Sequence, residues 1–258
     1  MWSIEFTDLT VYILVFARMC GLVALNPVIS RRNVPVRVRM ALILGLTLIL
    51  APGVSVEGVA GLETAPSLIW ALLVEVFVGL VCSSVFTLFY YMLFFAGDLL
   101  DTEFGLAMAK VFDPGSSIQM SVSSNLLNLL FMLYFFTTNS HLVLIKIFES
   151  SYQVVPVGGA VLSAEIPSFF FTLFTSVFSL ALRLALPFLA AMFVAELSMG
   201  VLMKLVPQIH VFVISIQFKI LMGMLLMLLF SVPLANFVDN YLIILFEEME
   251  KALLVLAP

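Results

Sequence analysis

Charged residues are scarce in this chain of 258 residues, and so are cysteine and histidine. Only 10% of the residues are Asp, Glu, Lys or Arg, against about 25% in soluble domains. There are two cysteines and two histidines. The sixteen acidic residues outnumber the eleven basic ones, which leaves a net charge of −5. This balance excludes the basic surface that binding to nucleic acid requires.

Motifs of the common enzyme classes are also missing. The sequence contains no His-Glu-x-x-His, Gly-x-Ser-x-Gly, Walker or Gly-x-Gly-x-x-Gly pattern, and it shows no cluster of metal ligands. Cys20 and Cys82 lie inside apolar runs, where we interpret them as small buried hydrophobes rather than a disulfide or redox pair. We therefore expect a protein that is not an enzyme and that carries neither a cofactor nor a metal ion.

Apolar residues dominate instead, at 63% of the chain with a mean hydropathy of +1.22. They form six long stretches, at about residues 9–29, 40–56, 66–96, 118–148, 166–198 and 207–238. A helix that spans a membrane needs about 20 apolar residues, and the last four stretches are longer than that. Pro187 and Pro233 interrupt two of them, and proline kinks or ends a helix. The sequence predicts an all-α, integral membrane-type protein of long kinked helices arranged as helical hairpins in one domain.

The two ends of the chain carry signals of their own. Residues 1–8 contain Glu5 and Asp8 and lack the positively charged region of a cleavable signal peptide, so we expect the first apolar run to remain in the mature protein. Residues 239–258 place Glu247, Glu248 and Glu250 among Leu, Ile and Phe. This pattern is typical of a short amphipathic helix that docks at a surface rather than spanning the membrane.

A basic loop follows the first apolar stretch. Four of the eleven basic residues, Arg31, Arg32, Arg37 and Arg39, fall within nine positions. The positive-inside rule predicts that this loop is cytoplasmic. Alternating six spans from there places both termini outside and residues 97–117 inside.

Residues 97–117 do not fit that topology well. They carry Asp98, Asp101, Glu103 and Asp113 against a single Lys110. The same segment is rich in large apolar residues, namely Leu99, Leu100, Phe104, Leu106, Met108, Val111 and Phe112. One interpretation is an acidic connector that lies on the helix bundle. The other is a re-entrant segment inside a cavity, where irregular backbone is tolerated, with Asp98 and Asp101 anchored to Arg18 or Arg183.

Five ionisable residues lie inside apolar runs, where contact with lipid is costly: Arg18, Glu75, Arg183, Glu196 and Lys219. We expect them to face protein or water, either as structural ion pairs and packing contacts or as a proton or ion relay.

Two small-residue faces accompany these charges. Glu75, Gly79 and Ser83 are four residues apart, as are Glu196, Gly200 and Lys204, so each set shares one helical face. Glycine on such a face lets another helix approach closely, and we expect helices of partner proteins there. The two patterns also form a weak internal repeat.

A set of short motifs occurs in a specific order and spacing. They are Phe16–Gly21 before Asn26-Pro27, Asn33–Arg39, Glu75–Gly79, Ala96–Asp98 with Gly105–Ala109 and Asp113-Pro114, Leu129–Phe131, Asn139–His141, Ser151 with Pro156, and Val206–Phe212. Through these motifs, over most of its length, the chain resembles the R subunit of the bacterial flagellar export gate. It equally resembles the injectisome counterpart of that subunit, the T subunit of type III secretion.

The resemblance implies a non-enzymatic subunit of a funnel-like gate through which unfolded proteins leave the cell. It implies a hetero-oligomer with P-type and Q-type subunits, and with a B-type or U-type export switch subunit. The assembly would lie in the bacterial inner membrane, with part of it toward the periplasm, in a flagellar basal body or an injectisome. Membrane lipid and unfolded export substrates would be its other partners.

The resemblance also implies a pore plug at about residues 105–120. The positions expected to form it are Phe104, Gly105, Leu106, Met108, Val111, Phe112, Asp113 and Pro114. The alternative function is a secondary transporter or ion channel, for which inverted repeats with interrupted helices would be the signature.

Overall fold

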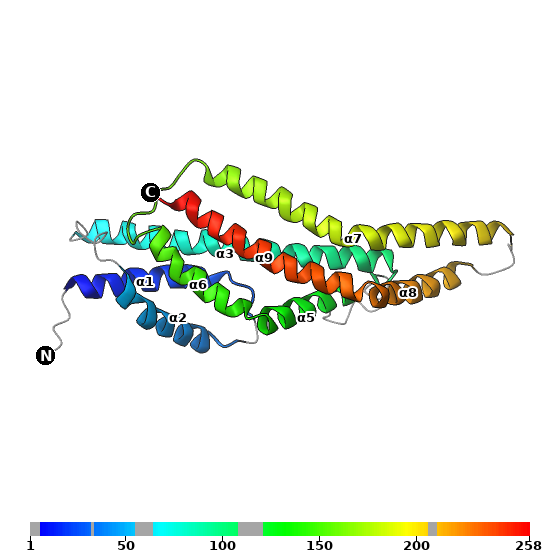
Figure 1. The fold of residues 1–258 in the computed structure, drawn as a ribbon, viewed down its shortest axis with the longest axis horizontal. Helices are drawn as coiled ribbons and strands as arrows, with labels where there is room; N and C mark the ends of the chain where they lie inside the picture. The colour runs from blue at the N-terminus through cyan, green and yellow to red at the C-terminus, as the bar shows by residue number, and fades with distance from the viewer. Residues whose placement is uncertain (1–5, 32–33, 55–63, 108–120, 206–210) are drawn as a thin grey trace. The chain divides into compact units, whose positions relative to one another are not determined.

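The computed structural model describes residues 6–31, 34–54, 64–107, 121–205 and 211–258. Within them the chain forms eight α-helices and one 3-10 helix, with no strand, which confirms the all-α class. The helices are α1 (Phe6–Ala24), α2 (Val36–Leu50), η1 (Ala51–Gly53), α3 (Ala65–Glu103), α5 (Val122–Thr137), α6 (Ser140–Val154), α7 (Ile166–Leu205), α8 (Val211–Leu229) and α9 (Ser231–Leu256). Figure 1 shows them with these labels.

Contacts divide the chain into two compact units. Unit 1 comprises Met1–Tyr90, Asn139–Phe174 and Ile243–Pro258, and unit 2 comprises Tyr91–Thr138 and Thr175–Leu242. Because α3, α7 and α9 each contribute residues to both units, neither unit is a continuous piece of sequence. The organisation as one domain stays a prediction.

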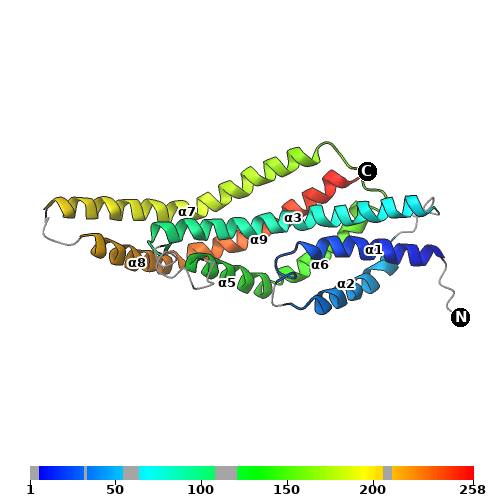
Figure 2. The ribbon, with the colours of Figure 1, turned by 180° about the vertical axis from the view of Figure 1, so that it is seen from behind.

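In unit 1, α1 lies beside α2 and along the first part of α3 (Figures 1 and 2). Two glycines allow α1 and α3 to touch: a Cβ added at Gly79 would come within 2.8 Å of the Gly21 Cα atom, and one added at Gly21 within 2.9 Å of the Gly79 Cα atom. The helix that packs on Gly79 is therefore α1 of the same chain. The expectation of a partner protein's helix at this face is wrong, because the glycine is used for folding.

In unit 2, the end of α3 packs against α7 and α8. Its core cluster contains Leu100, Phe104, Ala185, Phe188, Met192 and Leu226. A second close approach joins α3 to α5, since a Cβ added at Gly97 would lie 2.5 Å from the Ser124 Cα atom. These contacts hold the last turns of α3 in the interior of unit 2.

Several helix boundaries differ from the sequence-based expectations. Helix α3 continues to Glu103, so the segment expected to be a loop from residue 97 begins only at Phe104. Helix α7 runs through Pro187 without a break. At Pro233 the expectation of a bend is confirmed, because α8 and α9 meet at 64° around Phe230 and the proline lies in the first turn of α9. Proline is tolerated there because first-turn N–H groups have no partner inside the helix.

The C-terminal residues expected to form a separate amphipathic helix are the second part of α9. Met249, Ala252 and Leu253 are buried in unit 1, whereas Glu247 and Glu250 are exposed. This segment is amphipathic as expected, but it continues a longer helix rather than standing alone.

Three helical segments are long and apolar enough to cross a membrane, Val36–Gly53, Ala65–Glu103 and Ile166–Leu205, and the number rises to five if the pairs α5–α6 and α8–α9 each count as one span. Six spans would also require α1, whose apolar part is only Leu9–Ala24. Most of α1 is buried against its own chain. Packing inside the protein therefore accounts for the apolar residues of α1, and contact with lipid is not needed to explain them. The six-span topology stays a prediction.

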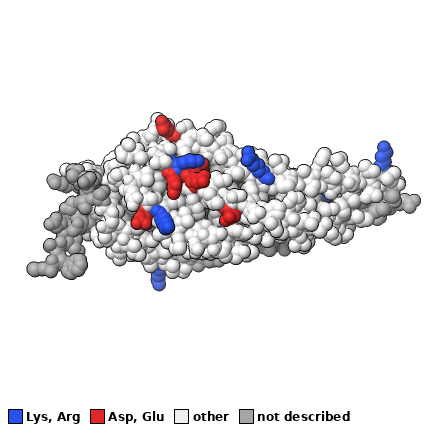
Figure 3. Space-filling model, in the orientation of Figure 1, with Lys and Arg blue, Asp and Glu red and all other residues white. Residues whose placement is uncertain are grey.

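Many large apolar side chains of the described residues are exposed, among them Ile49, Phe171 and Leu228. Figure 3 shows one face on which side chains other than Lys, Arg, Asp and Glu predominate. A surface of this kind needs lipid or other protein to cover it, and together with the long apolar helices it makes this a membrane-embedded protein.

Candidate functional site

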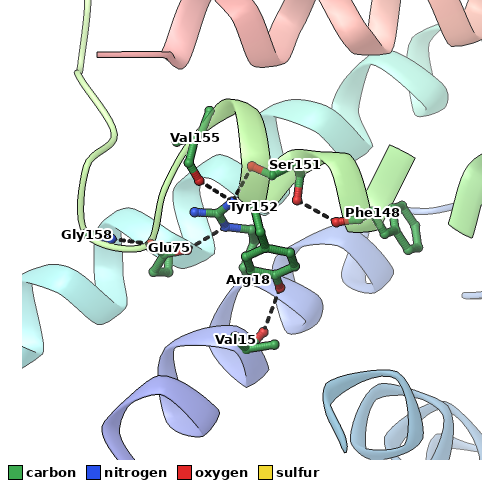
Figure 4. A network of polar contacts seen from close by, with 8 residues as sticks. All are labelled: Val15, Arg18, Glu75, Phe148, Ser151, Tyr152, Val155 and Gly158. Atoms are coloured by element: carbon green, nitrogen blue, oxygen red, sulfur yellow. Dashed lines mark hydrogen bonds and ion pairs between the residues drawn. The ribbon is translucent and has the colours of Figure 1, made fainter. Parts of the chain in front are cut away.

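Unit 1 contains a fully buried ion pair. Arg18 of α1 donates from Nε to the Glu75 Oε2 atom of α3 at 2.6 Å, and both side chains have no exposed surface (Figure 4). The pair lies one turn from the Gly21–Gly79 contact on the same two helices. The close backbone approach thus brings the two charged side chains within reach of each other.

Arg18 also caps the C-terminal end of α6. Its Nη1 atom donates to the carbonyl oxygen of Ser151 at 2.7 Å and to that of Val155 at 2.8 Å. The last carbonyl groups of a helix have no partner within the helix, and they lie at the negative end of its dipole. A guanidinium group at this position satisfies both the hydrogen bonds and the charge.

The second oxygen of Glu75 binds the turn that follows α6. The Gly158 N–H group donates to Oε1 at 2.9 Å, and Gly158 has a φ of 75°, which favours glycine. The Arg18 guanidinium lies over the Tyr152 ring, 4.4 Å from its centroid, and the Tyr152 hydroxyl donates to the Val15 carbonyl at 3.2 Å (Figure 4). Three segments distant in the sequence meet at this one pair.

The chemistry of this cluster is that of a structural link. Its two charges pair with each other, they are closed to solvent, and their other hydrogen bonds go to backbone groups. Within the described residues, no three His, Cys, Asp or Glu side chains are arranged to hold a metal ion. What the arrangement can do is fix the position of α6 and the following turn relative to α1 and α3.

The end of α3 carries the first of the expected plug residues. Phe104 is buried, with its ring against the backbone of Gly223 on α8 and an edge-on contact to Phe188. Gly105 follows with a φ of 74°, a conformation that ends the helix and favours glycine. Leu106 packs at the margin of the same core. Phe104 therefore anchors the start of the segment inside unit 2.

Asp101 ties the start of α5 to the end of α3. Its carboxylate accepts hydrogen bonds from the N–H groups of Val122 at 2.7 Å and Ser123 at 3.0 Å, at the positive end of the α5 dipole. The proposed anchoring of Asp101 to Arg18 or Arg183 is wrong, because Arg18 is in unit 1 with Glu75 and the helix N-terminus takes the carboxylate.

A second ion pair joins α7 and α8. Lys219 and Glu196 contact each other and remain partly exposed. The Lys219 side chain also passes over Gly105, where an added Cβ would lie 3.8 Å from the Lys219 Cβ atom. Gly200, one turn beyond Glu196, has open space around it, so its face is free for another helix.

Arg183 lies elsewhere on α7. It is exposed at the edge of a cavity of about 150 Å³ that is lined by Pro187, Phe230 and Pro233, among others. In the described part of the chain it makes no ion pair.

Arg39 of the basic loop binds described backbone groups close to it in the sequence. Arg39 donates to the carbonyl oxygens of Val34 at 3.0 Å and Arg31 at 3.2 Å. Arg31 in turn donates to the Tyr90 hydroxyl at 3.3 Å, and Arg37 is exposed. The remaining expected residues, Arg32, Met108, Val111, Phe112, Asp113 and Pro114, lie outside the described residues.

Sequence reasoning did not assign roles to several residues of these sites. The sequence does not indicate the contact of the Tyr152 ring with Arg18 or that of Gly223 with the Phe104 ring, because each contact joins helices that are far apart in the sequence. Gly21 did leave one, since it follows Arg18 by three residues and so lies on the same helical face. Gly97 likewise shares a helical face with Asp101, which follows it by four residues.

Comparison with known proteins identifies the family. Residues 9–243, nearly the whole chain, match the model of the family described as bacterial export proteins, family 1. This chain belongs to that family. It is therefore a component of a bacterial export apparatus that works with other components.

Individual relatives of this export protein come from different systems. It is 26% identical over 241 residues to the flagellar biosynthetic protein FliR of Escherichia coli, covering 93% of this chain and 90% of that protein. It is 26% identical over 251 residues to the Yop proteins translocation protein T of Yersinia pestis, covering 96% of each. The FliR protein of Bacillus subtilis is 23% identical over 245 residues, covering 94% of each. The similarity thus extends over whole chains.

Proposed function

We propose that this export protein is a non-enzymatic subunit of the export gate of a flagellar or injectisome type III secretion system. It helps to form and close the channel through which unfolded proteins leave the bacterial cell. The gate lies in the inner membrane with part of it toward the periplasm. Its other subunits are of the P and Q types, with a B-type or U-type switch subunit beside them.

The observation that carries this proposal is the coverage of the relatives. A flagellar biosynthetic protein and a translocation protein each align with at least nine-tenths of this chain. The internal structure is compatible with a non-enzymatic role, because the buried Arg18–Glu75 pair of unit 1 holds α1, α3 and the end of α6 together.

The proposed closing segment starts at the end of α3. Phe104 and Asp101 both belong to well-packed parts of unit 2, and Asp101 also holds the start of α5 at Val122. Phe104 and Ser121, the described residues on either side of positions 105–120, thus belong to one unit. Large side chains in such a segment would close a pore by excluding water, as hydrophobic constrictions do.

Assembly is the first test. The chain is co-expressed with the P-type and Q-type subunits of the same organism and purified through a tag on the P-type subunit. We expect this export protein in a complex of fixed composition by native mass spectrometry. A chain that purifies alone and transports a solute in proteoliposomes would support the transporter alternative instead.

Closure is tested separately on the assembled complex. Residues 106–116 are either deleted or replaced by a Gly-Ser segment of equal length, which preserves the connection and removes the bulk. We expect both variants to assemble and to conduct small ions in planar bilayers while the wild-type complex stays closed. Wild-type conductance from both variants would show that the segment is a passive connector.

A further inference from the structure

A cavity of about 400 Å³ lies in unit 1, between the end of α2 with η1 on one side and helix α6 on the other. Helices α2 and α6 are neighbours in both ribbon views (Figures 1 and 2). The volume falls within the range of about 300–1,000 Å³ that is typical of ligand sites. The cavity is thus large enough to accommodate a long side chain.

The lining of this cavity combines an aliphatic wall with two polar groups. Its aliphatic residues are Ile49, Leu50, Val54 and Ile145. Glu149 and Gln153 are four residues apart on α6, so they share one face of that helix and bring a carboxylate and an amide to the same cavity. Both of these polar residues are exposed.

Tyr152 forms the buried part of the lining, with only 6% of its surface exposed. Its ring packs on the Arg18 guanidinium and its hydroxyl donates to the Val15 carbonyl, so its position is fixed by the buried cluster described above. A wall that is held in place before binding loses less conformational entropy when a ligand arrives. The cavity is therefore a preformed feature of unit 1.

The charge of Glu149 has no counter-charge in the parts of the chain that the structure describes, because Glu149 forms no ion pair there. Lys146, one turn earlier on α6, does not pair with it and does not line the cavity. The α5–α6 pair is apolar enough to count as one membrane span, and a carboxylate in such a helix needs water or a positive group. A positive group that enters the cavity would complement Glu149.

We propose that this cavity is a docking site for a lysine or arginine side chain of another subunit of the export apparatus. Both side chains consist of an aliphatic stem and a cationic head, and they bury the stem along apolar surface. The stem would lie against the aliphatic wall, and the head would reach Glu149 and Gln153. The proposal requires only that this export protein works with other components, so it does not depend on the role in channel closure.

Two other occupants complement the cavity less well. Residues 55–63, which follow Val54 in the sequence, contain Glu57 and Glu63 and no basic residue, so their charge does not match Glu149. An anionic lipid headgroup is repelled by a carboxylate, and a zwitterionic headgroup brings a phosphate group together with its ammonium group. A basic side chain brings positive charge alone, which favours a protein partner.

The first experiment identifies the occupant in cells that contain the whole export apparatus. The photoreactive residue p-benzoylphenylalanine replaces Gln153, and the control position is Lys146, on the same helix but outside the cavity lining. We expect irradiation to link position 153 to a peptide of another subunit, with a lysine or arginine within about one helical turn of the attachment point. Position 146 should not form this link. A link from position 153 only to lipid or to residues of this chain, or no link at all, overturns the proposal.

The second experiment tests the charge of Glu149. Glu149→Lys is compared with Glu250→Lys, which changes an exposed acidic residue of the same unit outside the cavity. The amount of the linked subunit that copurifies with this protein is measured by quantitative mass spectrometry. We expect Glu149→Lys to lower that amount about tenfold, because two like charges then meet in the cavity, and Glu250→Lys to leave it unchanged.

Charge exchange distinguishes a lost contact from a misfolded variant. The basic residue that the first experiment identifies in the other subunit is replaced by Glu and combined with Glu149→Lys. We expect this combination to restore copurification, since the pair is re-formed with its charges reversed. Equal losses from Glu149→Lys and Glu250→Lys, or no restoration by the exchange, would refute the pairing.

Discussion

Removal of Glu75 should destabilise this protein far more than removal of an exposed acidic residue. The Glu75→Ala variant leaves the Arg18 guanidinium charged, fully buried and without its carboxylate. Breaking a buried pair in this way costs about 3–5 kcal/mol, because the remaining charge has no compensation. The Gly158 N–H group also loses its acceptor, which adds about 1–3 kcal/mol if no water replaces it. Against a total stability of about 5–15 kcal/mol, such a loss is severe.

The double variant Arg18→Ala/Glu75→Ala gives a sharper result. The double variant contains no uncompensated buried charge. We therefore expect its loss of unfolding free energy to be smaller than the sum of the losses in the two single variants. Recovery should stay incomplete, because Arg18 also satisfies the carbonyl groups of Ser151 and Val155 at the end of α6. Those two groups and Gly158 remain without partners in the double variant.

The free energy of unfolding is measured by denaturant titration of the purified protein in detergent, followed by far-UV circular dichroism. The matched control is Glu248→Ala, which removes a pair with Lys251 on a single helix. Such a pair contributes about 0.2–1 kcal/mol. If Glu75→Ala costs no more than Glu248→Ala, the reasoning from buried charge is refuted. An additive double variant would refute the coupling between Arg18 and Glu75.

The remaining predictions use the same unfolding measurement or simple extensions of it. Gly79→Ala should lower the free energy of unfolding by about 1–3 kcal/mol, because the added methyl group clashes with the α1 backbone. Gly200→Ala, which places a methyl group in open space, should be neutral or slightly stabilising. Equal effects of the two substitutions would contradict the contact between α1 and α3. Asp101→Ala should cost about 1–2 kcal/mol and should raise amide hydrogen exchange at the first turn of α5 selectively, and unchanged exchange there would argue against the cap. Phe104→Ala should cost about 3–5 kcal/mol as a core substitution, and a loss below 1 kcal/mol would mean that the ring is not anchored in unit 2.

Much of the helical architecture follows from patterns along the chain. Long apolar stretches predicted helices because a backbone without water must make its hydrogen bonds internally. The bend near Pro233 was predictable because proline lacks the N–H group needed inside a helix. The end of α3 was placed too early, since Asp98, Asp101 and Glu103 looked like loop residues. In the folded chain Asp101 is inside unit 2, where its charge meets the N-terminus of α5.

The sequence was sufficient to select individual residues of the candidate site, but it did not show which of them contact each other. Arg18 and Glu75 were identifiable because charges are costly inside apolar runs. Their pairing was not, since Glu196, Lys219 and Arg183 were equally available as partners. The same holds for Gly79, whose small size predicted a close helix contact without indicating that α1 would make it.

The amino-acid sequence by itself determined the class of this protein: apolar, helical, poor in charge, without catalytic motifs, and recognisable as an export protein through its motif order. Those properties depend on composition and on neighbours a few residues apart, so they can be read along the chain. Only the tertiary structure decided that Arg18 binds Glu75, two backbone carbonyls and the face of Tyr152, and that Phe104 is buried under Gly223. The physical reason is that an unsatisfied buried charge accepts any partner of suitable geometry, and helix packing alone determines which partner comes within hydrogen-bonding distance.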